Sequence, residues 1–198
     1  MTEDTIVAIS TPLGESGIGI VKLSGNKSIK IADKIFKAKN KEKLEKIPTF
    51  TVHFGSIINP ADKQPVDEVI VNVMKAPKTY TREDVVEINC HGGIVPLRKI
   101  LELCVKAGAR VAEPGEFTKR AFLNGRIDLA QAEAVVDIIK SKTEESLKAA
   151  VNQLKGKLSE EINKISKDLK NLCARVEANI EFAEEEIETT DLTKIKQE

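Results

Sequence analysis

Three charged residues in the first 126 positions interrupt patterns that are otherwise apolar or turn-forming. Lys22 and Glu87 each stand inside a β-branched, apolar stretch, and Arg126 follows an Asn-Gly turn. A carboxylate in such a strand either faces solvent or accepts a paired donor, whereas a lone lysine or arginine is ordinarily solvated. On the residues alone, Lys22 and Arg126 are expected to face solvent, Glu87 is either solvated or paired, and spacing does not unite the three.

The cysteines and histidines give less indication of a functional site than these charged residues do. The two histidines and three cysteines form no Cys-x-x-Cys pair, which disfavours both zinc sites and disulfide frameworks. Cys90 and His91 are adjacent at the end of a predicted strand, where neighbouring side chains point to opposite faces and are poorly placed for proton transfer. We therefore assign no catalytic residue and no metal ligand, and interpret residues 90–93 as a structural strand-to-helix turn.

Two glycine-containing segments resemble phosphate-binding loops only superficially. Residues 14–19 lie between two predicted strands and lack the Gly-x-Gly-x-x-Gly spacing, so they give little support to dinucleotide binding. Gly156-Lys157 would need glycine at 151 and serine or threonine at 158, where the chain has valine and leucine. The sequence given therefore contains no P-loop for a nucleoside triphosphate.

Composition narrows the class of protein further. The 198 residues contain 31 Lys+Arg and 31 Asp+Glu, and this zero net charge argues against strong bulk attraction to nucleic acid or acidic membranes, while leaving room for a local patch. The N-terminus lacks the pattern of a signal peptide, and no apolar run approaches the roughly 20 residues that span a bilayer. With three scattered cysteines, the sequence predicts a cytoplasmic protein without membrane contact.

The chain is expected to divide near residue 120. Ten of its 11 glycines and all seven prolines precede residue 126. The first part, 1–120, is predicted to be an α+β domain and the second, 121–198, all-helical. Within the first part we predict strands at 5–10, 18–23, 49–59, 66–74, 84–90 and 110–112, a loop at 37–46, and helices at 28–38 and 94–107.

One apolar stripe dominates the second part. It runs from Leu147 to Ile180 with a mean spacing of about 3.7 residues, which predicts one nearly straight helix of roughly 50 Å. Residues 129–139 are expected to form an antiparallel neighbour, with Asp128 as its N-cap. Because two helices bury such a stripe poorly, we expect further helices from another copy or from sequence not present here.

Two charge runs are interpreted as solvated surfaces. Residues 22–46 contain nine lysines and three acidic residues, whereas 181–191 contain six acidic residues and no basic ones. The helical composition resumes after the acidic run and stops abruptly, so we expect the chain to be a segment of a longer protein.

Longer stretches resemble a known family. Residues 4–12, 19–25, 80–93 and 113–134 are similar to the tRNA-modification GTPase family MnmE, also called TrmE. The resemblance implies an N-terminal domain with the folate-binding fold of aminomethyltransferases, which forms the homodimer and binds 5-formyl-tetrahydrofolate. It also implies a helical domain into which a Ras-like GTPase domain is inserted, and a C-terminal Cys-x-Gly-Lys motif.

The family's activity follows from the same resemblance. With the flavoprotein MnmG it adds a carboxymethylaminomethyl group to carbon 5 of the wobble uridine of certain tRNAs, and its GTP hydrolysis uses K⁺, Mg²⁺ and dimerisation of the GTPase domains. The present sequence lacks the GTPase domain, the second half of the helical domain and the C-terminal motif. We therefore expect it to bind folate and dimerise without hydrolysing GTP.

By motif position, the family's folate contacts fall on Lys22, Glu87 and Arg126. Many members have arginine in place of Lys22, a change that keeps the charge but loses the bidentate fork. Glu87 is suited to accept the pterin's amino and ring N–H groups, and Lys22 or Arg126 to neutralise the glutamate tail; which cation meets which end is left open. The donor is either 5-formyl- or 5,10-methylene-tetrahydrofolate.

Two other functions remain open from the sequence. A stand-alone folate-dependent one-carbon transferase would need an acid–base residue, for which His91 and Asp84 are weak candidates. A purely structural dimerisation or adaptor protein would use the helical stripe and no ligand.

Overall fold

The computed structural model describes residues 4–181. The chain divides into two compact units, one ending at Ile127 and the other beginning at Asp128, later than the predicted division at 120/121. Of the acidic run expected at 181–191, only Glu181 lies within the described residues. Among residues 4–181, no helix is both long and apolar enough to cross a membrane.

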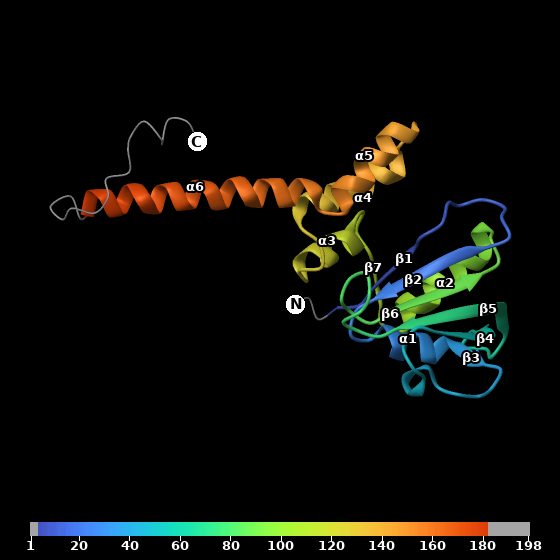
Figure 1. Cartoon of the computed structure of the whole chain (residues 1–198). Helices are drawn as coiled ribbons and strands as arrows, with labels where there is room; N and C mark the ends of the chain where they lie inside the picture. Colours follow the sequence, from blue (N-terminus) through green and yellow to red (C-terminus); the bar gives the residue numbers. More distant parts are fainter. Residues whose placement is uncertain (1–3, 182–198) are drawn as a thin grey trace. The chain divides into compact units, whose positions relative to one another are not determined.

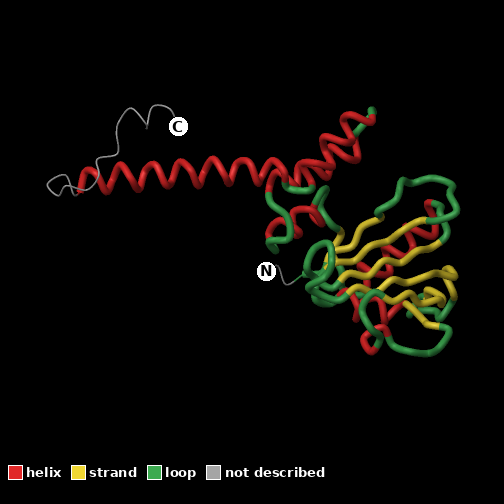
Figure 2. Tube along the Cα trace, in the orientation of Figure 1, coloured by secondary structure: helices red, strands yellow, loops and turns green. Residues whose placement is uncertain are grey.

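The first unit is built on a seven-stranded sheet (Figures 1 and 2) in the order β3-β4-β5-β6-β2-β1-β7. Neighbouring strands are antiparallel, except that β1 and β7 are parallel. The strands are β1 (Ile6–Ile9), β2 (Gly19–Ser24), β3 (Phe36–Ala38), β4 (Thr51–Ile58), β5 (Pro65–Met74), β6 (Val85–Cys90) and β7 (Arg110–Val111).

Helices α1 (Ser28–Ile35) and α2 (Ile94–Lys106) pack against the sheet. Alternation along β2 and β6 sends Val21, Leu23, Val86 and Ile88 into the core with these helices. The residues between them, Lys22 and Glu87 among them, belong to the opposite face. The predicted α+β class is confirmed, and the strand period explains how one face becomes core while the other stays polar.

The structure corrects the prediction for residues 28–46. The helix expected over 28–38 ends at Ile35, and the next three residues form the edge strand β3, in which Lys37 is exposed between buried Phe36 and Ala38. The segment predicted as a loop, 37–46, contains the last two residues of this strand and a 3₁₀ turn, η1 (Leu44–Lys46). The apolar positions fitted a helical period, but pairing with β4 satisfies the backbone and prevails.

An unpredicted helix, α3 (Glu116–Leu123), is joined to the sheet by a buried ion-pair network. Arg120 is 3% exposed, and its guanidinium contacts the carboxylates of Asp4 at 2.7 Å, Glu116 at 3.0 Å and Glu83 at 3.1 Å. It also donates to the main-chain oxygen of Asp4 at 3.0 Å. One side chain therefore connects the start of β1, the loop before β6 and α3.

The second unit contains α4 (Leu129–Lys140), α5 (Glu144–Leu154) and α6 (Lys157–Glu181). The predicted N-cap is confirmed, because the Asp128 carboxylate accepts the N–H of Gln131 at 2.8 Å in a reciprocal capping box. Helices α4 and α5 pack together, and Gln131 donates to the Leu154 carbonyl at 2.8 Å.

The prediction of one continuous helix from 147 to 180 is wrong. The chain breaks between α5 and α6 at Gly156, whose φ of +88° lies in the left-handed region that closes a helix. The apolar stripe continues across the break, but most of its α6 members remain exposed within the described residues: Leu158, Ile162, Ile165, Leu169, Val176 and Ile180.

Replacing Arg120 with alanine should destabilise the first unit by about 3 kcal/mol, since removing one partner of a buried ion pair leaves buried carboxylates uncompensated. The measurement is urea unfolding followed by far-UV circular dichroism. Lys119→Ala is the matched control, because Lys119 is exposed on the same helix. Equal stability of the two variants would show that the network contributes no net stability.

Candidate functional site

Lys22 and Glu87 form the centre of the candidate site. They are direct partners in the register of β2 and β6, and the Lys22 Nζ lies 3.2 Å from Glu87 Oε1. Their side chains are 20% and 26% exposed, so each is partly buried yet reachable by a ligand. Of the two interpretations of Glu87, solvated or paired, the structure supports the paired one.

An aromatic ring links this pair to Arg126. The Lys22 Nζ lies 5.4 Å from the ring centroid of Tyr80 and 5.6 Å from that of Phe117. The guanidinium carbon of Arg126 lies 4.8 Å from the same Tyr80 centroid. Both distances to Tyr80 are within the range of cation–π attraction. We call these five residues, Lys22, Tyr80, Glu87, Phe117 and Arg126, the Tyr80 cluster.

The end of α3 determines where Arg126 begins. Arg126 N–H donates to the Ala121 carbonyl, and Gly125 N–H to that of Phe122, both at 2.9 Å. This is the hydrogen-bond pattern of a Schellman motif. It requires a left-handed residue, which Gly125 supplies with φ of +68°. The Asn-Gly pair seen in the sequence therefore stops the helix and places Arg126 one residue later.

The loop before β6 is fastened to α3 at two places. Tyr80 Oη and Thr118 Oγ1 are hydrogen-bonded at 2.9 Å. The Asn124 amide donates to the Thr81 carbonyl at 2.6 Å, and Arg82 donates to the Asn124 carbonyl at 2.9 Å. These bonds hold the Tyr80 ring in place by its hydroxyl end and fix the backbone beside it.

The cluster combines three kinds of recognition chemistry. The Glu87 carboxylate has two oxygens with several lone pairs, so it can accept a donor from a ligand while it pairs with Lys22. Lys22 and Arg126 carry further N–H groups for an anion, and the Tyr80 ring offers a flat apolar face. A ligand with a donor edge, a planar ring and a carboxylate would match all three.

The other residues singled out from the sequence have separate partners. Cys90 Sγ bonds the Gly19 carbonyl, and burial raises the pKa of this thiol to about 11, so it is protonated at neutral pH. His91 Nδ1 lies 2.7 Å from Asp67 Oδ1, and this hydrogen bond raises the pKa of the imidazole. The carboxylate of Asp84 accepts the N–H of Ala76 at 2.9 Å.

Sequence reasoning did not identify Tyr80 and Phe117 as members of the site. A signal existed for the first, because Tyr80 is the chain's only tyrosine and opens the segment that contains Glu87. Phe117 offered no comparable signal, since its contact with Lys22 depends on α3, a helix that was not predicted.

Electrostatics favours the ionised form of Glu116 at the start of α3. The Arg110 guanidinium donates to both oxygens of this carboxylate, at 2.6 and 3.0 Å, and the Glu113 N–H donates to it at 2.8 Å. The bond from Arg110 is the largest cause that lowers the Glu116 pKa from its ordinary 4.5 to about 2. The Glu116 carboxylate, one of the three that pair with Arg120, is therefore charged throughout the neutral range.

Fold and site together define a protein in which an α+β domain with a cation–carboxylate–aromatic cluster precedes a helical domain. Residues 5–126 match the family model described as the GTP-binding protein TrmE N-terminus, and residues 129–198 match that of the MnmE helical domain. The chain therefore belongs to the MnmE (TrmE) family.

Individual relatives are similar over nearly the whole chain. Proteins named tRNA modification GTPase MnmE from Carboxydothermus hydrogenoformans and Ligilactobacillus salivarius are 58% and 56% identical over 99% and 98% of it. The protein of that name from Acetivibrio thermocellus is 58% identical over 94%. The matches cover 43%, 41% and 40% of those relatives, so the chain spans about two fifths of their length.

The stabilising effect of Glu116 should depend on pH. Because its pKa is lowered in the folded state, its contribution is present above the unfolded value near 4.5 and is lost as the pH falls towards 2. The stability difference between the wild type and Glu116→Gln should therefore be largest above pH 4.5 and shrink below it, as measured by urea midpoints. Glu113→Gln, an exposed neighbour, should leave the pH profile unchanged; a constant Glu116→Gln difference would contradict the assignment.

Proposed function

We propose that this chain is the folate-binding N-terminal part of a tRNA-modifying GTPase, and that the Tyr80 cluster is its folate site. Membership in the MnmE family supports the class of protein. The observation that carries the site is the convergence of Lys22, Glu87 and Arg126 around one aromatic ring. The ligand is a tetrahydrofolate, either the 5-formyl or the 5,10-methylene form.

The chemistry of the cluster suits that ligand. A pterin carries an amino group and ring N–H groups on one edge, and a carboxylate accepts such neighbouring donors in a short, charge-assisted pair. The Glu87 carboxylate would make this contact beside its ion pair with Lys22. The ligand's glutamate tail carries the negative charge that Lys22 or Arg126 would neutralise.

The activity proposed for the whole protein also requires parts outside this chain. With the flavoprotein MnmG, it would add a carboxymethylaminomethyl group to carbon 5 of the wobble uridine of tRNA, using GTP, K⁺ and Mg²⁺ in a GTPase domain outside these residues. The N-terminal domain would form a homodimer, and the protein would act in the cytoplasm. The relatives' name, tRNA modification GTPase, supports this assignment.

Calorimetric titration with 5-formyl-tetrahydrofolate tests the site. We expect saturable binding by the wild type, no heat with GTP, and a loss of at least about tenfold in affinity for Glu87→Gln, because an amide cannot replace the charge-assisted acceptor. Glu102→Gln is the matched control, since Glu102 is exposed on α2.

The outcomes separate the alternative functions. Unchanged binding by Glu87→Gln would remove this residue from the pterin. Absence of folate binding by the folded wild type would favour a structural scaffold, and transfer of a one-carbon unit to a small amine would favour a stand-alone transferase.

Tyr80 should contribute through its ring more than through its hydroxyl. Tyr80→Ala removes the flat surface near both cations and should weaken folate binding by about 1–3 kcal/mol, on the scale of aromatic stacking in ligand sites. Tyr80→Phe removes only the bond to Thr118 and should cost less than about threefold. Equal losses in the two variants, measured by the same titration, would show that the hydroxyl rather than the ring supports the site.

A further inference from the structure

A second region of the first unit carries an unbalanced positive charge. Residues 22–46 contain nine lysines and three acidic residues, in a chain whose total net charge is zero. The eight lysines from Lys27 onwards are all found in the stretch that forms α1, β3 and η1 or the turns beside them. The sequence favoured a solvated surface here, but the fold gathers many of these lysines around one hollow.

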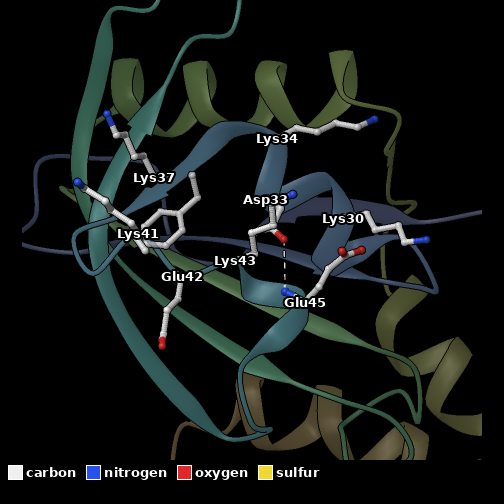
Figure 3. A pocket seen from close by; sticks show the side chains of 10 residues that line it. Lys30, Asp33, Lys34, Lys37, Lys41, Glu42, Lys43 and Glu45 are labelled. Atoms are coloured by element: carbon white, nitrogen blue, oxygen red, sulfur yellow. Dashed lines mark hydrogen bonds between the residues drawn. The ribbon is translucent and has the colours of Figure 1, made fainter.

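The hollow has a volume of about 480 Å³. Its lining comes from α1, β3, the segment between β3 and η1, and Glu45 of η1, all consecutive in the chain (Figure 3). In this view the amines of Lys37 and Lys41 extend to one side and those of Lys30 and Lys34 to the other. We call the five lysines of the lining the lysine rim: Lys30, Lys34, Lys37, Lys41 and Lys43.

Two of the three acidic residues in the lining already have partners. The Asp33 carboxylate accepts the backbone N–H of Leu44 at 2.8 Å and of Glu45 at 3.3 Å, so it shapes the η1 turn. Glu42 accepts a hydrogen bond from the Asn40 side chain at 2.8 Å. These carboxylates keep their negative charge, so the five lysines and three acidic residues of the lining leave a net charge of +2 at the hollow.

The lysine rim carries more positive charge than the acidic residues of the lining offset. Within residues 4–181, no rim lysine forms an ion pair with a carboxylate, and the only pair made by any lysine is that of Lys22 with Glu87. Lys34 donates one hydrogen bond to the Ala107 carbonyl and keeps two further N–H groups. A polyanion could engage these amines without first breaking an internal salt bridge.

We propose that the lysine rim binds the phosphate backbone of RNA, and specifically of tRNA. Lysines are flexible point charges that neutralise phosphates irrespective of base sequence. Lys30 and Lys34, four residues apart on α1, present their charges on one helix face. The choice of tRNA as the RNA rests on the proposed function; the phosphate chemistry rests on the rim itself.

The lining favours RNA over an acidic membrane. Amphipathic segments that insert into a membrane surface combine cations with exposed apolar side chains that enter the lipid. The apolar residues of this hollow, Phe36 and Ala38, are only 7% and 6% exposed and therefore offer no such anchor. Their burial also excludes base stacking, which leaves backbone contacts as the mode of binding.

The rim and the Tyr80 cluster can be tested separately. The five rim lysines lie on α1, whose apolar side packs into the core, or on the edge strand β3 and the segment after it. The cluster lies on β2, β6 and α3 and in the segments next to them, and no residue belongs to both sets. Changes in the rim should therefore leave folate binding intact.

The test measures binding of the chain to bulk bacterial tRNA across a salt series. The triple variant Lys30→Glu, Lys37→Glu, Lys43→Glu should bind at least about tenfold more weakly, and the slope of log affinity against log salt should fall by roughly 0.7–0.9 for each phosphate that the variant no longer neutralises. A second triple variant, with glutamine at the same positions, should bind more tightly than the glutamate triple and guards against misfolding caused by charge reversal.

The matched control changes net charge equally at another surface. Lys164→Glu, Lys167→Glu, Lys170→Glu alters three exposed lysines of α6 and should retain most of the affinity for tRNA. Equal losses in the two glutamate triples would overturn the proposal, because binding would then follow bulk charge. Failure of the wild type to bind tRNA at low salt, or rim-dependent binding to phosphatidylserine vesicles instead, would also overturn it.

Titration of the same proteins with 5-formyl-tetrahydrofolate keeps the two proposals distinguishable. Folate binding without tRNA binding would reject the lysine rim and leave the folate proposal in place. Rim-dependent tRNA binding without folate binding would support the rim and reject the folate site.

Discussion

The ion-pair network around the Arg120 guanidinium positions most of the polar side chains near the candidate site in the first unit. A buried cation is tolerated only when its donors and charge are matched, and here three carboxylates and a carbonyl match them. Those partners come from the start of β1, the loop before β6 and the first turn of α3. Tyr80 lies in that loop, and Phe117 and Arg126 lie on α3 or just after it, so every aromatic and cationic group around the Lys22–Glu87 pair is positioned from elements that Arg120 joins.

The two faces of the sheet have different roles. Side chains of one parity along β2 and β6 pack with α1 and α2 into an apolar core, whereas those of the other parity leave Lys22 and Glu87 accessible. The helix-covered side supplies stability and the open side supplies recognition. A shift of one residue in the register of β2 would exchange these roles and bury Lys22. The same core that holds the fold together therefore also fixes the pairing of lysine and glutamate.

What the sequence could predict follows from how local each feature is. Alternation and turn residues located most strands, and Asp128 was recognisable as an N-cap because the residues that complete the cap are its near neighbours. The end of the helix at Ile35 could not be predicted, because β3 forms only when it pairs with β4, which is distant in the chain. Gly156 was visible as the one glycine in a helical region, but the periodicity of the stripe outweighed it.

Some residues of the candidate site were identified from the sequence and others were not. Lys22, Glu87 and Arg126 came from a family resemblance, and the structure brings them together, although their role with folate stays a prediction. Tyr80 and Phe117 were missed because their positions depend on the buried Arg120 network, whose members span residues 4 to 120 and share no sequence signature. Long-range ion pairs of this kind leave no periodic pattern.

The two borders of the sheet have a consequence for solubility. One border is the three-residue strand β3, whose exposed middle position is Lys37, and the other is the two-residue strand β7, which carries Arg110. Short strands offer few free backbone groups and are therefore poor templates for another chain. At β3 the charge of Lys37 adds repulsion between copies, whereas Arg110 of β7 is already paired with Asp4 and Glu116. Copies of this domain are therefore discouraged from joining border to border into open-ended fibrils.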